Sequence, residues 1–236
     1  MQDLRITPTL ARDMRFAGLL YLAIIVAGLS AELLLRGPLI HLDDASATAA
    51  AILSATGQFR LAIAADLVMA VCDAGLAIML FLIFRSSAPR LALAAMVFRL
   101  IQTVLIAANL MSLQMAWLLL SRDVGQPIDQ AQSLALLFLD LHAHGYDLGL
   151  VFFGINSLMT GALVWRSGMF AKAIGAGLVA AGVVYLIGSS LRFFAPDLSS
   201  AFAPAYAVTI LAETVFCLRL LLQRRAVGIG SDSVAN

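Results

Sequence analysis

Charge is scarce in this sequence. Asp, Glu, Lys and Arg together make up 12% of the 236 residues, hydrophobic residues make up 62%, and the formal net charge is +1. The mean hydropathy of +0.97 lies far outside the range of soluble domains, of whose residues about 25% are charged. Without a basic stripe, nucleic acid is not an expected partner. No window has the alternating pattern of a membrane β-barrel. The composition therefore predicts an all-α, polytopic membrane helix bundle.

Cysteine is also scarce, and the common site motifs are missing. Cys72 and Cys217 both lie in apolar segments, where a thiol behaves as a small hydrophobic group. The sequence has no CxxC pair, no HExxH and no ExxH pair of the di-iron type, so a metal site would have to be assembled from scattered residues. It has no GxSxG turn either, which disfavours a serine hydrolase.

Six hydrophobic segments are long enough to cross a membrane, since a spanning helix needs about 20 apolar residues. Charged or turn-forming stretches separate these segments. We expect a single transmembrane domain over residues 1–236, with spans near 16–35, 61–84, 91–119, 146–165, 171–191 and 204–222.

The distribution of basic residues predicts the orientation of the bundle. Cytoplasmic loops are enriched in Arg and Lys. One side of the predicted bundle collects Arg5, Arg12, Arg15, Arg85, Arg90, Arg166, Lys172, Arg224 and Arg225. On the other side, arginines are diluted by Asp43, Asp44, Asp123, Asp129 and Asp197. We therefore expect both termini to be cytoplasmic, and the protein to be a multipass component of the bacterial inner membrane.

Two outer connections are longer than a turn needs. Residues 43–57 predict a short outer helix that begins after Asp44 as N-cap and ends at Gly57. Residues 129–143 have a helical pattern and continue into the fourth span. An unbroken helix over 130–165 would be about 54 Å long, well beyond the ~30 Å membrane core. It must either project outward or break, and Gly145 is the expected breakpoint. We expect residues 228–236 to be a disordered tail.

The segment LDLHAHGYDLGLVFFG, residues 139–154, concentrates ionisable groups in this apolar chain. A charge at a helix centre in a bilayer costs about 2.5 to 3.5 kcal/mol on insertion scales, so such groups are usually functional or paired. Helical spacing places Asp140, His144 and Asp147 on one face, and His142 and Tyr146 on another.

These groups share their expected depth with Glu32 and Asp66, which suggests one outward-facing polar cavity. We expect Asp66, His144 and Asp147 to bind a small cationic or metal ligand or to relay protons there, with Glu32 and Asp140 at the entrance. His142 and Tyr146 belong to the same candidate site. Carboxylate and imidazole are suitable ligands for a divalent metal, and the candidate metal ligands are His144, Asp147, Asp66 and Glu32.

Other interpretations remain open. A bound metal could make the protein a hydrolase of a lipid-like substrate. A small-residue face at Gly175, Gly177 and Gly182 could suit an accessory subunit that packs on a membrane-protein partner or on a second copy, besides lipids. Deeper in the membrane, we expect a structural polar network of Asp73, Arg99, Gln102 and Asn109.

Three segments also carry a resemblance to a known family: AGLLYLAIIVAGLSAE at 17–32, ADLVMAVCD at 65–73, and the helix segment at 139–154. Together they resemble a bacterial family of six-helix integral membrane proteins described as a domain of unknown function, DUF4386. The resemblance covers nearly the whole chain and implies the six-span architecture. It implies no activity.

Overall fold

The computed structural model describes residues 7–122 and 125–222, and within these ranges the regular structure is entirely helical. Six helical segments are long and apolar enough to cross a membrane. This confirms the predicted all-α bundle of six spans. The segments are Pro8–Leu39, Thr56–Phe84, Pro89–Ser121, Ile128–Ser167, Lys172–Phe194 and Pro196–Leu221.

Local sequence signals explain where several helices begin and end. The Thr7 hydroxyl caps α1 (Pro8–Leu29) by accepting the Leu10 N–H at 3.2 Å. Proline occupies the first turn of α1 and of α4 (Pro89–Ser121), where its missing N–H costs nothing. Helix α5 (Ile128–Ser167) ends at Gly168, whose φ of +67° is the left-handed conformation that favours glycine.

Two spans are built from more than one element. Helix α1 continues into the π-helix η1 (Ser30–Arg36) and the 3₁₀ turn η2 (Gly37–Leu39). The last span begins with η3 (Pro196–Leu198), α7 (Ser199–Phe202) and η4 (Ala203–Ala205), and continues as α8 (Tyr206–Leu221).

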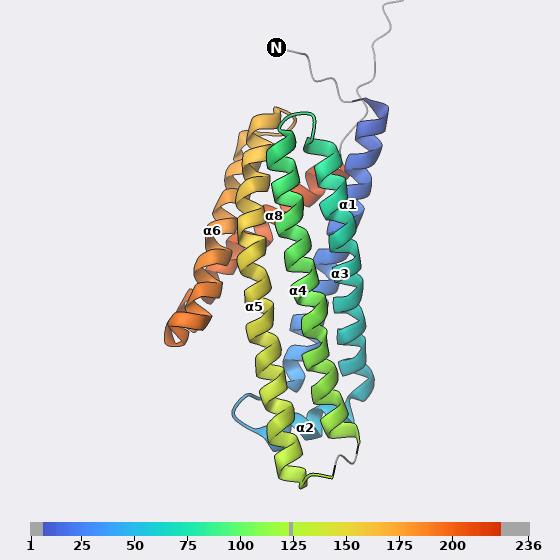
Figure 1. Cartoon of the computed structure of the whole chain (residues 1–236), viewed down its shortest axis with the longest axis vertical. Helices are drawn as coiled ribbons and strands as arrows, with labels where there is room; N and C mark the ends of the chain where they lie inside the picture. The colour runs from blue at the N-terminus through green and yellow to red at the C-terminus, as the bar shows by residue number, and fades with distance from the viewer. Residues whose placement is uncertain (1–6, 123–124, 223–236) are drawn as a thin grey trace, which may run out of the picture.

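The six spans form a closed ring in chain order (Figure 1). Helix α1 packs on α3 (Thr56–Phe84), followed by α4, α5 and α6 (Lys172–Phe194). Helix α8 crosses behind the bundle and packs on both α6 and α1, which closes the ring. The described ends of α1 and α8, at Pro8 and Leu221, lie at one end of the molecule, which we call the terminus end.

Helix α5 is continuous through Gly145, so the expected break does not occur. Its 40 residues measure about 60 Å, twice the ~30 Å membrane core. The helix therefore projects, and residues 129–143 are its first turns and not a separate helix. The short helix α2 (Ala45–Ser54) lies across this projecting end (Figure 1).

Only the N-cap of α2 is as expected. Asp44 Oδ1 accepts the Ala47 N–H at 2.9 Å. Helix α2 ends at Ser54, however, and Gly57 lies in the first turn of α3, so Gly57 is not the C-cap. The predicted tail at 228–236 lies outside the described residues.

Two hydrophobic clusters fill the ends of the bundle. One lies at the terminus end and contains Met14, Phe84, Phe170, Phe216 and Leu220. The other lies under α2 and contains Leu39, Ile52, Phe59, Leu113 and Leu139. The buried polar residues of the candidate site lie between these two cores.

Helices α5 and α6 approach closely through glycine. A Cβ added at Gly175 would lie 2.7 Å from the Gly161 carbonyl oxygen, and one added at Gly182 would lie 2.8 Å from the Gly154 carbonyl oxygen. The small residues that we considered for packing against a partner are therefore used within the chain. The physical reason is that only glycine permits this backbone contact.

Candidate functional site

Polar residues form a layer about one membrane thickness from the terminus end. On α1, α3, α5 and α6, a polar residue lies about 20 residues along the chain from a basic residue at the terminus end, which is about 30 Å of helix. The four pairs are Arg15 with Arg36, Arg85 with Asp66, Arg166 with Asp147, and Lys172 with Arg192. This layer is the depth at which the sequence placed the candidate site.

One side of the layer is the boundary cluster, which we define as Glu32, Arg36 and Asp66. Arg36 is 3% exposed. Its Nη1 donates to Asp66 Oδ2 at 2.5 Å, and its Nη2 pairs with Glu32. Arg36 directly follows the predicted span 16–35 and was not among the predicted site residues. The signal that could have found it is its position four residues after Glu32, on the same helix face.

The π-helix brings Arg36 into this position. A π-helical turn is wider than an α-helical one and leaves carbonyls without their usual partners. Here the Gln58 amide donates to the Leu35 carbonyl at 3.0 Å and to the Leu34 carbonyl at 3.3 Å. These two hydrogen bonds from Gln58 on α3 therefore stabilise the irregular end of the first span.

His142 and Tyr146 lie on the α5 face that meets α4 and α3. The Asn109 side-chain amide donates to the His142 carbonyl at 2.7 Å, and Tyr146 points at Met69, with 3.9 Å between its hydroxyl and the sulfur. Gly145 permits this approach, because an added Cβ would collide with the Asn109 side chain. Asn109 thus binds α5 and does not join Asp73 and Arg99.

The other face of α5 meets α6 and forms the second part of the layer. We define the α5–α6 cluster as Asp140, His144, Asp147, Ser189 and Arg192. Asp147 pairs with Arg192, and Ser189 Oγ donates to Asp147 Oδ1 at 3.4 Å. His144 Nδ1 lies 3.5 Å from Asp140 Oδ1, and its ring packs on Phe193 with the centroids 6.0 Å apart.

The structure therefore divides the candidate metal ligands between two clusters. Glu32 and Asp66 belong to the boundary cluster, whereas His144 and Asp147 belong to the α5–α6 cluster. Among residues 7–122 and 125–222, no group of three or more His, Cys, Asp or Glu residues is placed to hold a metal ion. Asp66 and Asp147 instead bind arginines, and this arrangement neutralises buried carboxylates without a metal.

Deeper in the bundle, Asp73 and Arg99 form an ion pair between α3 and α4. Arg99 is 2% exposed, and its Nε donates to Asp73 Oδ1 at 2.8 Å. The Thr103 hydroxyl donates to Asp73 Oδ2 at 2.6 Å. The Gln102 amide nitrogen donates to the same oxygen at 2.7 Å, in the amide orientation that satisfies both of its polar atoms. The Asp73 carboxylate is thus well compensated.

Aromatic rings connect this pair to a second buried carboxyl group. The Arg99 guanidinium lies between the rings of Tyr21 and Phe153, at 5.3 and 5.0 Å from their centroids. Phe153 packs edge-on against Tyr185, whose hydroxyl donates to Glu213 Oε1 at 2.5 Å. We define the central cluster as Tyr21, Asp73, Arg99, Tyr185 and Glu213. Glu213 was not among the predicted site residues, although it is the single acidic residue of α8.

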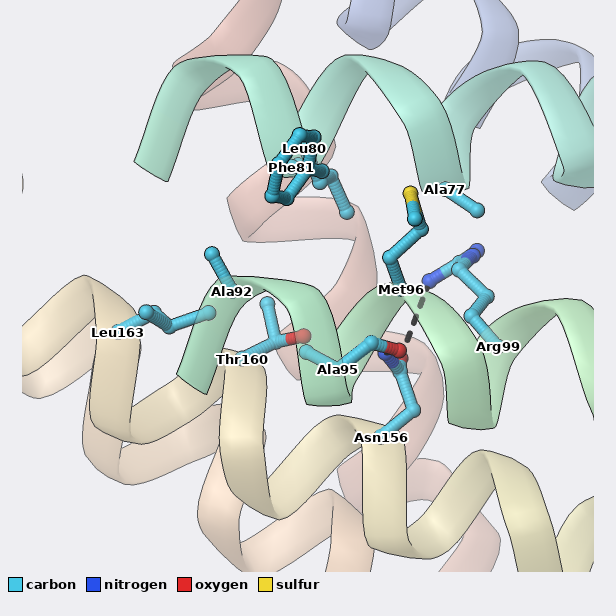
Figure 2. A pocket seen from close by; sticks show the side chains of 10 residues that line it. All are labelled: Ala77, Leu80, Phe81, Ala92, Ala95, Met96, Arg99, Asn156, Thr160 and Leu163. Atoms are coloured by element: carbon cyan, nitrogen blue, oxygen red, sulfur yellow. Dashed lines mark hydrogen bonds between the residues drawn. The ribbon is translucent and has the colours of Figure 1, made fainter. Parts of the chain in front are cut away.

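A cavity adjoins the central cluster on the side of the terminus end (Figure 2). Its volume is about 10 Å³, and α3, α4 and α5 line it. The polar part of the lining comes from Arg99, Asn156 and Thr160. This cavity lies on the opposite side of the Asp73–Arg99 pair from the layer in which an outward-facing cavity was expected.

A comparison with protein families identifies the family of this chain. The family model described as "Domain of unknown function (DUF4386)" matches residues 16–223. The chain belongs to the DUF4386 family. The match includes every residue of the three clusters of this DUF4386 chain, so the resemblance seen in the sequence is confirmed.

One curated relative can be described. An uncharacterized protein of Archaeoglobus fulgidus is 35% identical over 80 residues, which are 34% of this chain and 46% of that protein. This DUF4386 chain therefore spans less than half the length of the relative. No solved structure matches the chain.

Proposed function

We propose that this multipass membrane protein relays protons between the polar layer and the central cluster. The observation that carries the proposal is Glu213. Its side chain is 8% exposed, it accepts a hydrogen bond from Tyr185, and it takes part in none of the ion pairs within residues 7–122 and 125–222. An ionisable residue inside a membrane span is a functional candidate by default.

A row of hydroxyl and carboxyl groups supports a route from Asp147 to Glu213. Ser189 Oγ contacts Asp147 at 3.4 Å, and the Tyr206 hydroxyl lies against Gly188, the residue before Ser189. The Tyr206 and Tyr185 rings pack with their centroids 5.9 Å apart. Hydroxyl groups both donate and accept hydrogen bonds, which a proton relay requires.

Arg99 gives this route a fixed charge at its inner end. The guanidinium pairs with Asp73 and is connected to Glu213 through the rings of Phe153 and Tyr185. Because arginine stays protonated in proteins, it stabilises the Glu213 carboxylate whenever that group has released its proton. We therefore assign proton exchange to Glu213 and charge compensation to Arg99.

The alternatives have less support from the geometry. A small cation or metal would need carboxylates that are free to bind it, but Asp66 and Asp147 are engaged by Arg36 and Arg192. A metal-dependent hydrolase needs about three protein ligands, and the described residues offer no such group. An inner-membrane location, with both termini cytoplasmic, remains part of the proposal.

Proton flux into liposomes tests the proposal. Purified protein is reconstituted with a pH-sensitive dye inside, and a potassium diffusion potential drives proton uptake. We expect uptake to fall at least about tenfold in Glu213→Gln, because positioned acid–base groups typically contribute a factor of about 10² or more. Asp197→Asn is the control, since Asp197 is exposed and belongs to none of the three clusters.

Two outcomes would contradict the proposal. One is wild-type uptake no faster than that of protein-free liposomes. The other is Glu213→Gln that conducts at the wild-type rate. Infrared titration supplies a second measurement, because the C=O stretch of a protonated carboxylic acid that titrates in wild type should be missing in Glu213→Gln.

A further inference from the structure

We propose that the cavity beside Arg99 is a binding site for an ordered water molecule, which extends the relay toward the terminus end. The water's role in proton transfer rests on the proposed function, whereas its presence does not. A cavity needs about 10–15 Å³ to hold one water, and this cavity measures about 10 Å³. It therefore suits a single water and excludes a larger ligand.

The polar groups for one water are present. Arg99 Nη2 lies 2.5 Å from Asp73 Oδ1, but not in hydrogen-bonding geometry, and it has no hydrogen-bond partner among the described residues. Arg99 Nη1 makes only a long bond to Asn156 Oδ1, at 3.4 Å. A water in the cavity can accept from the Arg99 guanidinium and donate to the Asn156 or Thr160 oxygen. Two to four polar partners are what a buried water needs.

The side chain of Asn156 is held in place for this role. Its amide nitrogen donates to the Ala95 carbonyl on α4 at 2.7 Å. This bond turns the amide oxygen toward Arg99, as Figure 2 shows. The oxygen is thus fixed as an acceptor at the polar end of the cavity.

The cavity extends from the central cluster in one direction. Along α4 its lining runs from Arg99 to Ala92, and along α5 from Asn156 to Leu163. On both helices these lining residues lead toward the terminus end, where Phe84 and Phe170 belong to the apolar core. The route through Asp147 serves the opposite side. Water beside Arg99 therefore extends the polar route by one group toward the terminus end.

Hydroxyl-radical footprinting of the reconstituted protein tests this site. A short X-ray pulse converts bound water into radicals, which oxidise the nearest methionine to its sulfoxide. Met96 lines the cavity, whereas Met79, in the same core and also half-buried, does not. We expect Met96 to be oxidised several-fold faster than Met79.

Two variants make the test specific. Ala95→Leu fills the cavity, and Thr160→Val removes a polar partner with almost no change in shape. Both should lower Met96 oxidation to the Met79 level. Ala180→Leu is the control for the first, because Ala180 is exposed on α6 and distant in sequence from the lining. If Ala95→Leu does not fold, the Met96 oxidation of Thr160→Val alone decides the test.

Equal oxidation of Met96 and Met79 in wild type would overturn the inference, as would Met96 oxidation that neither variant reduces. Proton flux is scored separately. Rapid Met96 oxidation without flux would leave the water site standing and remove the relay. Proton flux without faster Met96 oxidation would leave the relay standing and remove the water site.

Discussion

Asp147 on α5 binds Arg192 on α6 at the depth at which Asp66 on α3 binds Arg36 on η1, at the end of the first span. The two ion pairs thus connect neighbouring helices on opposite sides of the ring. They differ in burial, because the Arg36 side chain is 4% exposed and the Arg192 side chain is 37% exposed. This difference determines how much each pair contributes to stability.

Removing Arg36 should therefore cost more than removing Arg192. Arg36→Met leaves the buried Asp66 carboxylate without its partner, which costs about 3–5 kcal/mol. Arg192→Met should cost less than Arg36→Met, since the Arg192 side chain is 37% exposed and water partly screens its pair with Asp147. Thermal unfolding in mild detergent, followed by Trp117 and Trp165 fluorescence, measures both. Equal losses of thermal stability in Arg36→Met and Arg192→Met would contradict the assigned difference in burial.

The Asp73–Arg99 pair should show strong coupling. We expect Arg99→Gln and Asp73→Asn each to destabilise the protein by about 3–5 kcal/mol, and the double variant by less than the sum, because no unpaired charge remains. A double-mutant cycle from denaturant unfolding measures the coupling. Additive effects would show that the two groups do not depend on each other.

Gly145 is predicted to be intolerant of any side chain. Gly145→Ala forces a methyl group against the Asn109 side chain, and such overpacking costs about 1–3 kcal/mol. Gly57→Ala is the control, because no atom lies within 4 Å of a Cβ added there. That control should stabilise α3 slightly, as alanine favours a helix over glycine. A comparison of the two melting temperatures checks the prediction.

Helix α2 should loosen in acid. The Ala47 N–H and the Ser46 hydroxyl hold the pKa of Asp44 below its ordinary value of 3.8. A lowered pKa stabilises the folded form at pH values above that of the unfolded chain, and this stabilisation is lost as pH falls through the folded pKa. The hydrogen-exchange protection factors of residues 45–54 should therefore fall below about pH 3.8. Asp44→Ala, which cannot cap, should show fast exchange at every pH.

Reporter fusions check the predicted orientation. Green fluorescent protein fused after residue 236 should fluoresce, because it folds on the cytoplasmic side, where the positive-inside rule puts the terminus. Alkaline phosphatase inserted between residues 42 and 45 should be active, since this enzyme becomes active only on the side of the membrane opposite the cytoplasm. The reverse pattern would contradict the assignment of both termini to the cytoplasm.

Much of the candidate site follows from helical periodicity. The spacing of Asp140, His144 and Asp147 correctly puts them on one face of α5, with His142 and Tyr146 on another. Periodicity could not say which helix each face meets. That depends on the rotation of α5 and on the ring order of the spans, and both result from packing among residues distant in sequence.

Hydropathy and charge determined the six spans, because each span depends on residues within one segment. The family resemblance came from three short segments, at 17–32, 65–73 and 139–154. Tertiary structure alone decided that α5 runs unbroken past Gly145 and that Tyr185 and Phe153 connect Glu213 to Arg99. It also decided that a π-helix turns Arg36 toward Asp66. The physical reason is that a buried charge is stabilised by its nearest partner in space, and in a helix bundle that partner lies on another span.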